Sequence, residues 1–259
     1  MARVEMIRAT ANSGDMDLRC DAPPLAAPPP PPAQGMSLTP ELVALTIRPE
    51  PDLGPEPGWT ELTPPQLDAL AAQYDAECGD DPLWVFAYGS LIWKPDFDAE
   101  EHLRASAWGW HRSFCLKMHR WRGSPQQLGL KMALERGGRC DGVIYRVRAL
   151  DRLAQIRRML EREIRYHENR AMVRWITVRT ERGPIRVLVF WAGPKGERIL
   201  SRLPLRDVAH ILARACGPAG SCAEYLFNTV LHLRDFGIQD RNLWALQDMV
   251  AEEIRALNE

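Results

Sequence analysis

The strongest structural signal in this chain is the stretch Phe86-Ala87-Tyr88-Gly89-Ser90-Leu91-Ile92-Trp93. An apolar, β-prone run from Leu83 to Tyr88 predicts a buried strand, which breaks at Gly89-Ser90 before apolar side chains resume. Backbone N–H groups at such a break can point into one small space, which suits a carboxylate or a phosphate. The turn is therefore a candidate anion site, and we expect a positive φ at Gly89. An ordinary turn between strands is the alternative.

Composition and charge limit the function classes. The 259 residues are 46% apolar and 26% charged, and 33 basic residues against 34 acidic ones leave a net charge of -1. This balance gives no field that would favour nucleic acid or an anionic membrane. No apolar run is long enough to span a membrane, and residues 1–20 lack the apolar core of a signal peptide. We therefore expect a cytoplasmic protein of one large or two small domains.

The cysteines and histidines show no metal-binding pattern. There is no CxxC motif, and no histidine pair has zinc-finger spacing. The expectation is free thiols in a reducing compartment, without a Cys216–Cys222 disulfide, for the cysteines at 20, 78, 115, 140, 216 and 222.

The N-terminal part differs from the rest of the chain. Residues 1–57 contain the run Pro28–Pro32 and many further prolines, which predicts a disordered tail with local polyproline II structure. Such a tail either stays solvated or binds a Pro-recognising partner that the sequence does not identify. Residues 58–80 form a helical lead-in, in which Thr63 caps a helix that begins at Pro64-Pro65. The apolar stripe of this helix is Leu67, Leu70, Ala71 and Tyr74.

Strands come first in the remaining chain, one helix is inserted, and helices follow, which is an α+β pattern. The inserted helix runs from Asp151 to about Arg165, and three more cover 204–215, 223–236 and 240–257. Gly137-Gly138 and Arg182-Gly183-Pro184 are expected turns. The predicted strands are Leu83–Tyr88, Arg104–Trp110, Ser113–Met118, Leu128–Leu134, Gly142–Val147, Met172–Thr180 and Ile185–Trp191.

Glu163 is the candidate acid or base on the inserted helix. It falls about 20° from Ile156 on the helical wheel, at the edge of the apolar stripe. A carboxylate in that place is partly desolvated, which raises its pKa and improves it as a base near neutral pH. The alternative is a glutamate that reaches out to solvent. The stripe itself consists of Leu153, Ile156, Leu160 and Ile164.

Basic residues alternate with aromatic ones between residues 110 and 122, which raises nucleic-acid binding as an alternative. The neutral overall charge and the alternating spacing favour two strand faces instead, one polar and one buried. The residues concerned are Arg112, Lys117, Arg120 and Arg122, with Trp110, Phe114 and Trp121.

Several ordered motifs together resemble the ChaC-type γ-glutamylcyclotransferases, over roughly residues 82–250. The glycine turn 88–95 is similar to the hallmark of that family, and Leu160-Glu161-Arg162-Glu163-Ile164 resembles its catalytic Arg-Glu step. The family usually has a glycine and an aromatic residue shortly after the catalytic glutamate, whereas this chain has Arg165-Tyr166-His167-Glu168-Asn169. Either Tyr166 or Met172 takes the aromatic place. The other similar segments are 112–114, 122–125, 129–130, 133–134, 140–146 and 217–226.

The resemblance implies a mixed β-sheet or partial barrel in a catalytic domain of residues 81–259, with an inserted catalytic helix and C-terminal helices. It implies cyclisation of the γ-glutamyl group of glutathione to 5-oxoproline with release of Cys-Gly, without cofactor or metal. Glu163 is then the general acid and base.

The resemblance also assigns substrate contacts. The N–H groups of Gly89, Ser90 and Leu91 would hold the substrate's α-carboxylate. Tyr88 would contact either the γ-glutamyl unit or the developing oxyanion. Arg112 would serve the distal carboxylate, unless it is a structural arginine of its strand.

Two other functions stay open at this point. One is a cyclotransferase for other γ-glutamyl amides, and the other is a non-catalytic binding or regulatory module on the same fold.

Overall fold

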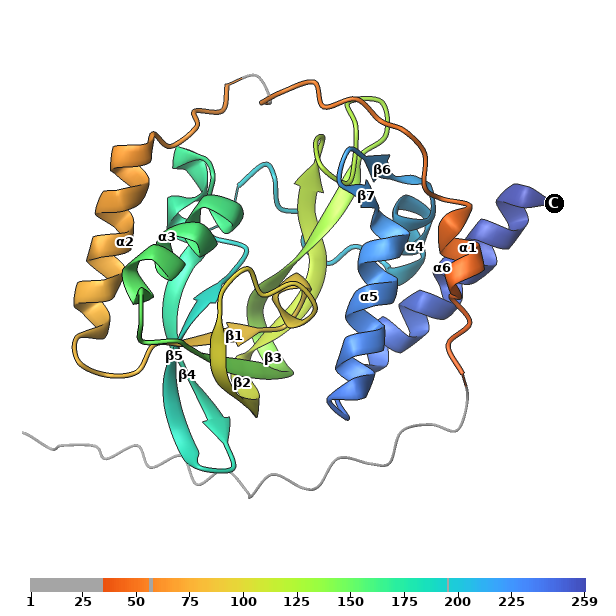
Figure 1. Cartoon of the computed structure of the whole chain (residues 1–259). Helices are drawn as coiled ribbons and strands as arrows, with labels where there is room; N and C mark the ends of the chain where they lie inside the picture. The colour runs from red at the N-terminus through yellow and green to blue at the C-terminus, as the bar shows by residue number, and fades with distance from the viewer. Residues whose placement is uncertain (1–34, 56–57, 195) are drawn as a thin grey trace, which may run out of the picture.

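The computed structural model of the chain describes residues 35–55, 58–194 and 196–259. A five-stranded barrel lies at the centre, with two helices on one side and the C-terminal helices on the other (Figure 1). This arrangement confirms the predicted α+β class and the mixed sheet.

The barrel has the strand order β1-β3-β2-β4-β5 and closes through a parallel contact of Val85 with Leu188. All its other strand neighbours are antiparallel. The strands are β1 (Trp84–Ala87), β2 (Ala99–Met118), β3 (Gly129–Val147), β4 (Val173–Thr180) and β5 (Gly183–Phe190).

β2 and β3 are each one long strand where the sequence predicted two shorter ones. The two segments expected between residues 104 and 118 form one strand, and so do those expected between 128 and 147. Gly137-Gly138, expected as a turn, stays inside β3 with φ of 107° and 73°, close to Gly109 of β2, which has φ of 77°. The pairing register shifts at this place. The glycines therefore form an irregularity in a continuing ladder, which the sequence reading took for a strand end.

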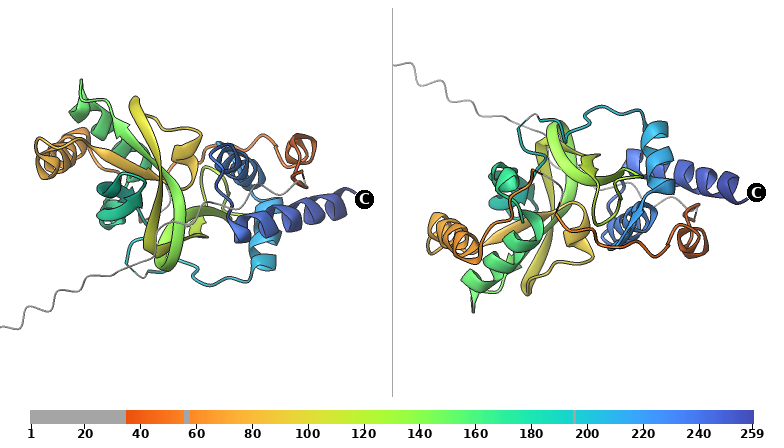
Figure 2. Two further views of the ribbon diagram at one scale, coloured as in Figure 1. Left: turned by 90° about the horizontal axis from the view of Figure 1, so that it is seen from below. Right: turned by 90° about the horizontal axis from the view of Figure 1, so that it is seen from above.

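α2 (Pro64–Cys78) and α3 (Arg152–Glu163) pack against each other beside the barrel (Figures 1 and 2). α2 begins with a capping box in which Gln66 Oε1 accepts from the N–H of Thr63 at 2.9 Å, and its predicted stripe is buried. The predicted stripe of α3 is buried at Ile156, Leu160 and Ile164, but Leu153 is 48% exposed. Leu150 is exposed as well, so the start of α3 extends beyond the apolar contact.

The three predicted C-terminal helices are confirmed as α4 (Leu205–Arg214), α5 (Cys222–Asp235) and α6 (Arg241–Asn258). A small hairpin of β6 (Cys216–Gly217) and β7 (Gly220–Ser221) separates the first two. Asp240 caps α6 as expected, because its Oδ1 accepts from the N–H groups of Asn242 and Leu243 at 3.0 and 3.1 Å.

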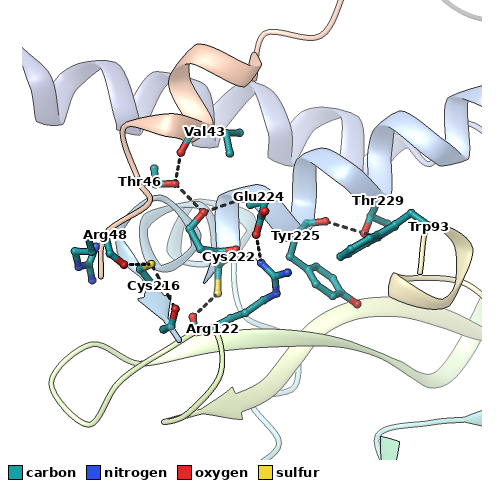
Figure 3. A network of polar contacts seen from close by, with 12 residues as sticks. Val43, Thr46, Arg48, Trp93, Arg122, Cys216, Cys222, Glu224, Tyr225 and Thr229 are labelled. Atoms are coloured by element: carbon teal, nitrogen blue, oxygen red, sulfur yellow. Dashed lines mark hydrogen bonds and ion pairs between the residues drawn. The ribbon is translucent and has the colours of Figure 1, made fainter. Parts of the chain in front are cut away.

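The expected disorder of residues 1–57 is wrong for the part that is described, residues 35–55. This segment contains the helix α1 (Pro40–Ala44), and Leu38 is fully buried, with its N–H donating to Gln247 Oε1 at 2.8 Å. Thr46 shares a hydrogen bond of 2.7 Å with Ser221 at the start of α5 (Figure 3). The chain then crosses the molecule to α2 (Figure 1). The polyproline run and the proposed partner-binding tail lie outside the described residues.

Two further expectations concern the cysteines and membrane-spanning segments. Cys78, Cys115, Cys140, Cys216 and Cys222 are free thiols, so the expected absence of a Cys216–Cys222 disulfide is confirmed. Cys20 lies outside the described residues. In the described ranges, no helix combines the length and the apolar character needed to cross a membrane.

Candidate active site

The glycine turn leaves the barrel at the end of β1. β1 ends at Ala87, and the 3-10 helix η1 (Ser90–Ile92) begins three residues later. Gly89 has φ -145° and ψ -130°, so the expected positive φ is wrong. A glycine is required for space instead, because a Cβ there would lie 2.8 Å from Tyr225 Oη. The N–H of Ser90 donates to the same oxygen at 3.3 Å.

Glu163 is the last residue of α3, and its side chain is only 6% exposed. Each carboxylate oxygen faces one cation: Lys131 Nζ lies 2.8 Å from Oε2, and Arg162 Nε lies 3.2 Å from Oε1. Arg162 also donates to Ser90 Oγ at 3.0 Å and to the carbonyl of Lys94. The guanidinium of Arg162 therefore links the carboxylate of Glu163 to Ser90 in the glycine turn.

The electrostatic surroundings of Glu163 reverse the expected pKa shift. Burial favours the neutral acid, as the sequence predicted, and is the largest single effect. The charges of Lys131 and Arg162, together with the hydrogen bond from Lys131, outweigh it and lower the pKa of Glu163 below its ordinary value. The prediction of a raised pKa is therefore wrong, and the carboxylate is ionised at neutral pH.

Two buried tyrosines stand beside the carboxylate. Tyr88 donates its hydroxyl proton to the carbonyl of Phe190 at 2.6 Å. Burial raises the pKa of both Tyr88 and Tyr225, and the nearby Glu163 raises it further. Both side chains are therefore neutral phenols. Figure 3 shows Tyr225 extending from α5 toward the strands.

These groups enclose a cavity of about 20 Å³ that contains the turn and the carboxylate together. The predicted site residues Tyr88, Gly89, Ser90, Leu91 and Glu163 all line it, so the structure brings these five together. Its remaining lining residues are Lys131, Met132, Phe190 and Tyr225.

A larger cleft of about 550 Å³ is lined by Ser90, Lys131 and Glu163 on one side and extends away from them. Trp93 and Trp121 supply aromatic surface, and Arg122 lies over the rings of Trp93 and Tyr225 (Figure 3). Cations outnumber carboxylates in this wall. Its charged residues are Lys94, Asp96, Arg122, Lys131, Arg158, Glu161, Arg162, Glu163 and Arg165.

Tyr166 and Met172 both line a third cavity, of about 110 Å³, which they share with Lys131 and Glu163. Tyr166 is 8% exposed, and its hydroxyl accepts from Arg120 at 2.9 Å. Both residues that the sequence left as alternatives after Glu163 thus lie in the wall of one cavity beside the end of α3.

Arg112 lies apart from this group and does not line any of the three cavities that contain Glu163. Its side chain is 2% exposed, and the guanidinium donates to the carbonyls of Tyr88, at 2.9 Å, and Asp141. Its Nε lies 3.1 Å from Asp240 Oδ2. The arginine thus fixes β1 and β3 to the start of α6, which is the structural role that the sequence left open.

Lys131 and Tyr225 are the site residues that sequence reasoning missed. Lys131 stands between the buried Leu130 and Met132, so strand alternation presents it as an ordinary polar face. Tyr225 falls in the C-terminal segment 217–226, where no local pattern marks it as a site residue. The sequence around these two residues does not indicate that either one lies close to Glu163.

The chain is similar to known proteins in sequence and in fold. Residues 83–253 match the family model described as ChaC-like protein. A glutathione-specific γ-glutamylcyclotransferase of Escherichia coli is 32% identical over 182 residues, which cover 68% of this chain and 75% of that protein. The γ-glutamylcyclotransferase 2-1 of Arabidopsis thaliana is 33% identical over 191 residues, covering 68% and 88%. The crystal structure of a glutathione-specific γ-glutamyl cyclotransferase from yeast has a TM-score of 0.58 at 20% identity and covers 66% and 99%, which shows the shared fold.

Proposed function

The chain belongs to the ChaC-like family, and from this premise we propose that it converts glutathione to 5-oxoproline and Cys-Gly, with Glu163 as the base and acid. The observation that carries the proposal is the buried, ionised carboxylate of Glu163 in one cavity with the glycine turn. A reaction in which an amino acid's own amine attacks its side-chain carbonyl needs this combination of a base and a carboxylate-holding backbone.

The proton balance of the reaction requires one group that both accepts and donates. The substrate's α-ammonium, with an ordinary pKa near 8, gives a proton to the Glu163 carboxylate. The free amine nitrogen attacks the γ-carbonyl carbon, and a five-membered ring forms. The attacking nitrogen begins as an ammonium and ends as the lactam N–H, so it loses a second proton as the ring closes. The amide C–N bond then breaks, Glu163 returns its proton to the leaving nitrogen, and Cys-Gly takes up the second proton to become an ammonium. No water enters the products.

Positioning is the main contribution of the protein to this cyclisation. A well-oriented intramolecular attack gains on the order of 7 to 11 kcal/mol at best. In this proposal the N–H groups of residues 89–91 hold the α-carboxylate. Arg162 keeps Glu163 at a fixed distance from that turn through its contact with Ser90.

The oxyanion of the tetrahedral intermediate needs a donor, and Tyr225 suits that role better than Tyr88. The proton of Tyr88 is already used in the hydrogen bond to Phe190. Tyr225 Oη accepts from the N–H of Ser90, and its own proton remains available for the substrate.

The Cys-Gly part of the substrate would occupy the cleft of about 550 Å³. The excess of cations in its wall favours a substrate with a distal carboxylate, such as the glycine end of glutathione. The same observation disfavours γ-glutamyl-lysine, whose free amine is cationic.

A comparison of substrates tests the proposal and its alternatives. Purified protein is incubated with glutathione, γ-glutamyl-alanine or γ-glutamyl-lysine, and 5-oxoproline is quantified by mass spectrometry. Preference for glutathione supports the proposal, and preference for either other compound supports a broader cyclotransferase. Absence of 5-oxoproline with all three compounds contradicts both and leaves a non-catalytic module.

A further inference from the structure

Lys131 is the second cation at Glu163 and lines all three cavities that reach the carboxylate. It projects from β3, and its Nζ lies 2.8 Å from Glu163 Oε2. This is the one ion pair and the one side-chain hydrogen bond recorded for Lys131 in the described part of the chain. Its side chain is 31% exposed, whereas that of Glu163 is 6% exposed.

The two cations at Glu163 differ in how firmly they are held. Arg162 has two further partners, Ser90 Oγ and the carbonyl of Lys94, so it cannot leave without disturbing the glycine turn. Lys131 has a flexible four-carbon stem and ends beside an open cleft. Lys131 is therefore the cation that can move.

The substrate brings a third positive charge to the same carboxylate. In the proposed reaction the α-ammonium must contact Glu163 in order to lose its proton. Oε1 faces Arg162, so Oε2 is the oxygen left for the substrate's ammonium, and Lys131 pairs with that oxygen in this structure. Two ammonium groups on one buried oxygen repel each other.

We propose that Lys131 is the resting counter-ion of Glu163. The ammonium of Lys131 occupies the place that the substrate's α-ammonium takes in the complex, and it moves away from Glu163 when the substrate binds. This inference rests on the proposed function. Lys131 is in this account a positioning residue, because it acts through Glu163 and takes no part in bond making or breaking.

The exchange has a consequence for proton binding at Glu163. In the empty site, burial favours the neutral acid, and Lys131 and Arg162 together keep the pKa of Glu163 below its ordinary value. Without Lys131, only Arg162 opposes burial until the substrate's ammonium arrives. The other titratable side chains facing the carboxylate are neutral phenols, Tyr88 from the end of β1 and Tyr225 from α5. The charged groups farther along the cleft are Lys94, Asp96, Arg122, Arg158, Glu161 and Arg165. The cavity of about 110 Å³ adds Lys117, Arg120 and Arg198.

The test is the pH dependence of 5-oxoproline formation by wild type and Lys131→Met. The profile of kcat/KM reports the free enzyme, and that of kcat reports the substrate complex. For Lys131→Met we expect the acid limb of kcat/KM to move upward by about one pH unit or more, the size typical of a lost neighbouring charge. The acid limb of kcat should move by less than half as much, because the substrate's ammonium replaces the lysine.

Two control variants separate this effect from a general change of charge. Lys131→Arg keeps a cation beside Glu163 and should keep the acid limb of kcat/KM near that of wild type. Lys117→Met removes one positive charge from strand β2, in the wall of the cavity of about 110 Å³ but outside the ion pairs of Glu163, and should also leave the limb in place. An unshifted kcat/KM limb in Lys131→Met overturns the proposal, and equal shifts of both limbs overturn the exchange.

A measurement without turnover distinguishes failure of this inference from failure of the proposed function. The titration of Glu163 is followed by NMR in protein labelled with ¹³C at glutamate carboxyls, and Glu163→Gln assigns the signal. An upward shift in Lys131→Met supports the counter-ion role even if wild type releases no 5-oxoproline. An unchanged titration in a folded variant contradicts that role even if wild type is fully active.

Discussion

Arg162 Nε lies 3.2 Å from Glu163 Oε1, so the last two residues of α3 form an ion pair inside the site. The same guanidinium donates to Ser90 Oγ at 3.0 Å, which fixes the distance between the proposed base and the glycine turn. The neighbouring arginine is thus as much a part of the site geometry as the carboxylate.

Replacing Arg162 should impair turnover more than binding. In Arg162→Met the carboxylate loses its link to Ser90, and misplacement of about 1 Å costs roughly 100-fold in rate. Steady-state kinetics with glutathione at neutral pH should show this loss mainly in kcat, and Arg162→Lys should recover part of it. Wild-type kcat in Arg162→Met would show that the link has no positional role.

Because Gly89 and Tyr225 lie so close together, the effect of Gly89→Ala on KM should depend on whether Tyr225 is also replaced. In Gly89→Ala the new Cβ would lie 2.8 Å from Tyr225 Oη and 3.4 Å from Met132 Sδ, so the turn must shift. Tyr225→Phe removes the first of these atoms. We therefore expect Gly89→Ala to raise KM for glutathione at least about tenfold alone and much less in the Tyr225→Phe background, a coupling typical of residues in contact. Additive effects would contradict the steric explanation.

Tyr225 and Tyr88 form a matched pair for the oxyanion assignment. Tyr225→Phe should lower kcat by roughly 100-fold or more, as loss of an oxyanion donor does. Tyr88→Phe loses the hydrogen bond to Phe190 and should lower the free energy of unfolding by about 1 kcal/mol with a smaller effect on kcat. Kinetics and urea denaturation measured on both variants check the assignment. A larger kcat loss in Tyr88→Phe would reverse it.

Arg112 is expected to matter for stability. Arg112→Met leaves Asp240 and two backbone carbonyls without their partner, and breaking a buried ion pair of this kind costs about 3 to 5 kcal/mol. Urea denaturation should show this loss, while KM for glutathione in the remaining folded protein stays near that of wild type. A raised KM with unchanged stability would restore Arg112 as a substrate ligand.

The segment before α2 should contribute to the free energy of unfolding. Leu38 is fully buried, at 0% exposure to solvent, so Leu38→Ala should lower the free energy of unfolding by about 2 to 5 kcal/mol. The exposed Leu53, at 67%, provides a control of the same type with a change below about 0.5 kcal/mol. Equal denaturation midpoints for both variants would contradict the packing of residues 35–55 on the C-terminal helices.

Local patterns in the sequence were sufficient to predict most helices and strands, and to predict the glycine turn and Glu163 as parts of the site. The apolar run before Gly89 and the stripe around Ile156 predicted β1 and the helix that ends at Glu163. Strand alternation could not show that Lys131 faces α3, because that contact depends on the closure of the barrel. The direction of the pKa shift at Glu163 was missed for the same reason, since periodicity predicts burial but not the partner across the barrel.

The remaining errors have a similar origin in long-range contacts. The space at Gly89 is limited by Tyr225, which belongs to the last third of the chain. Leu38 contacts α6 through the hydrogen bond from its N–H to Gln247, far along the chain. The proline-rich composition around Leu38 hid an N-cap at Thr39 that is followed by a proline at the first helical position.

Comparison of wild type with Glu163→Gln tests the central claim most directly. Each protein is incubated with reduced glutathione, and 5-oxoproline and Cys-Gly are quantified together. The account predicts equal amounts of the two products from wild type and less than about a tenth of that rate from a folded Glu163→Gln variant, because loss of general acid–base catalysis costs roughly 100- to 10,000-fold. Retention of more than a tenth of the wild-type rate by Glu163→Gln would contradict the role of Glu163 as the base.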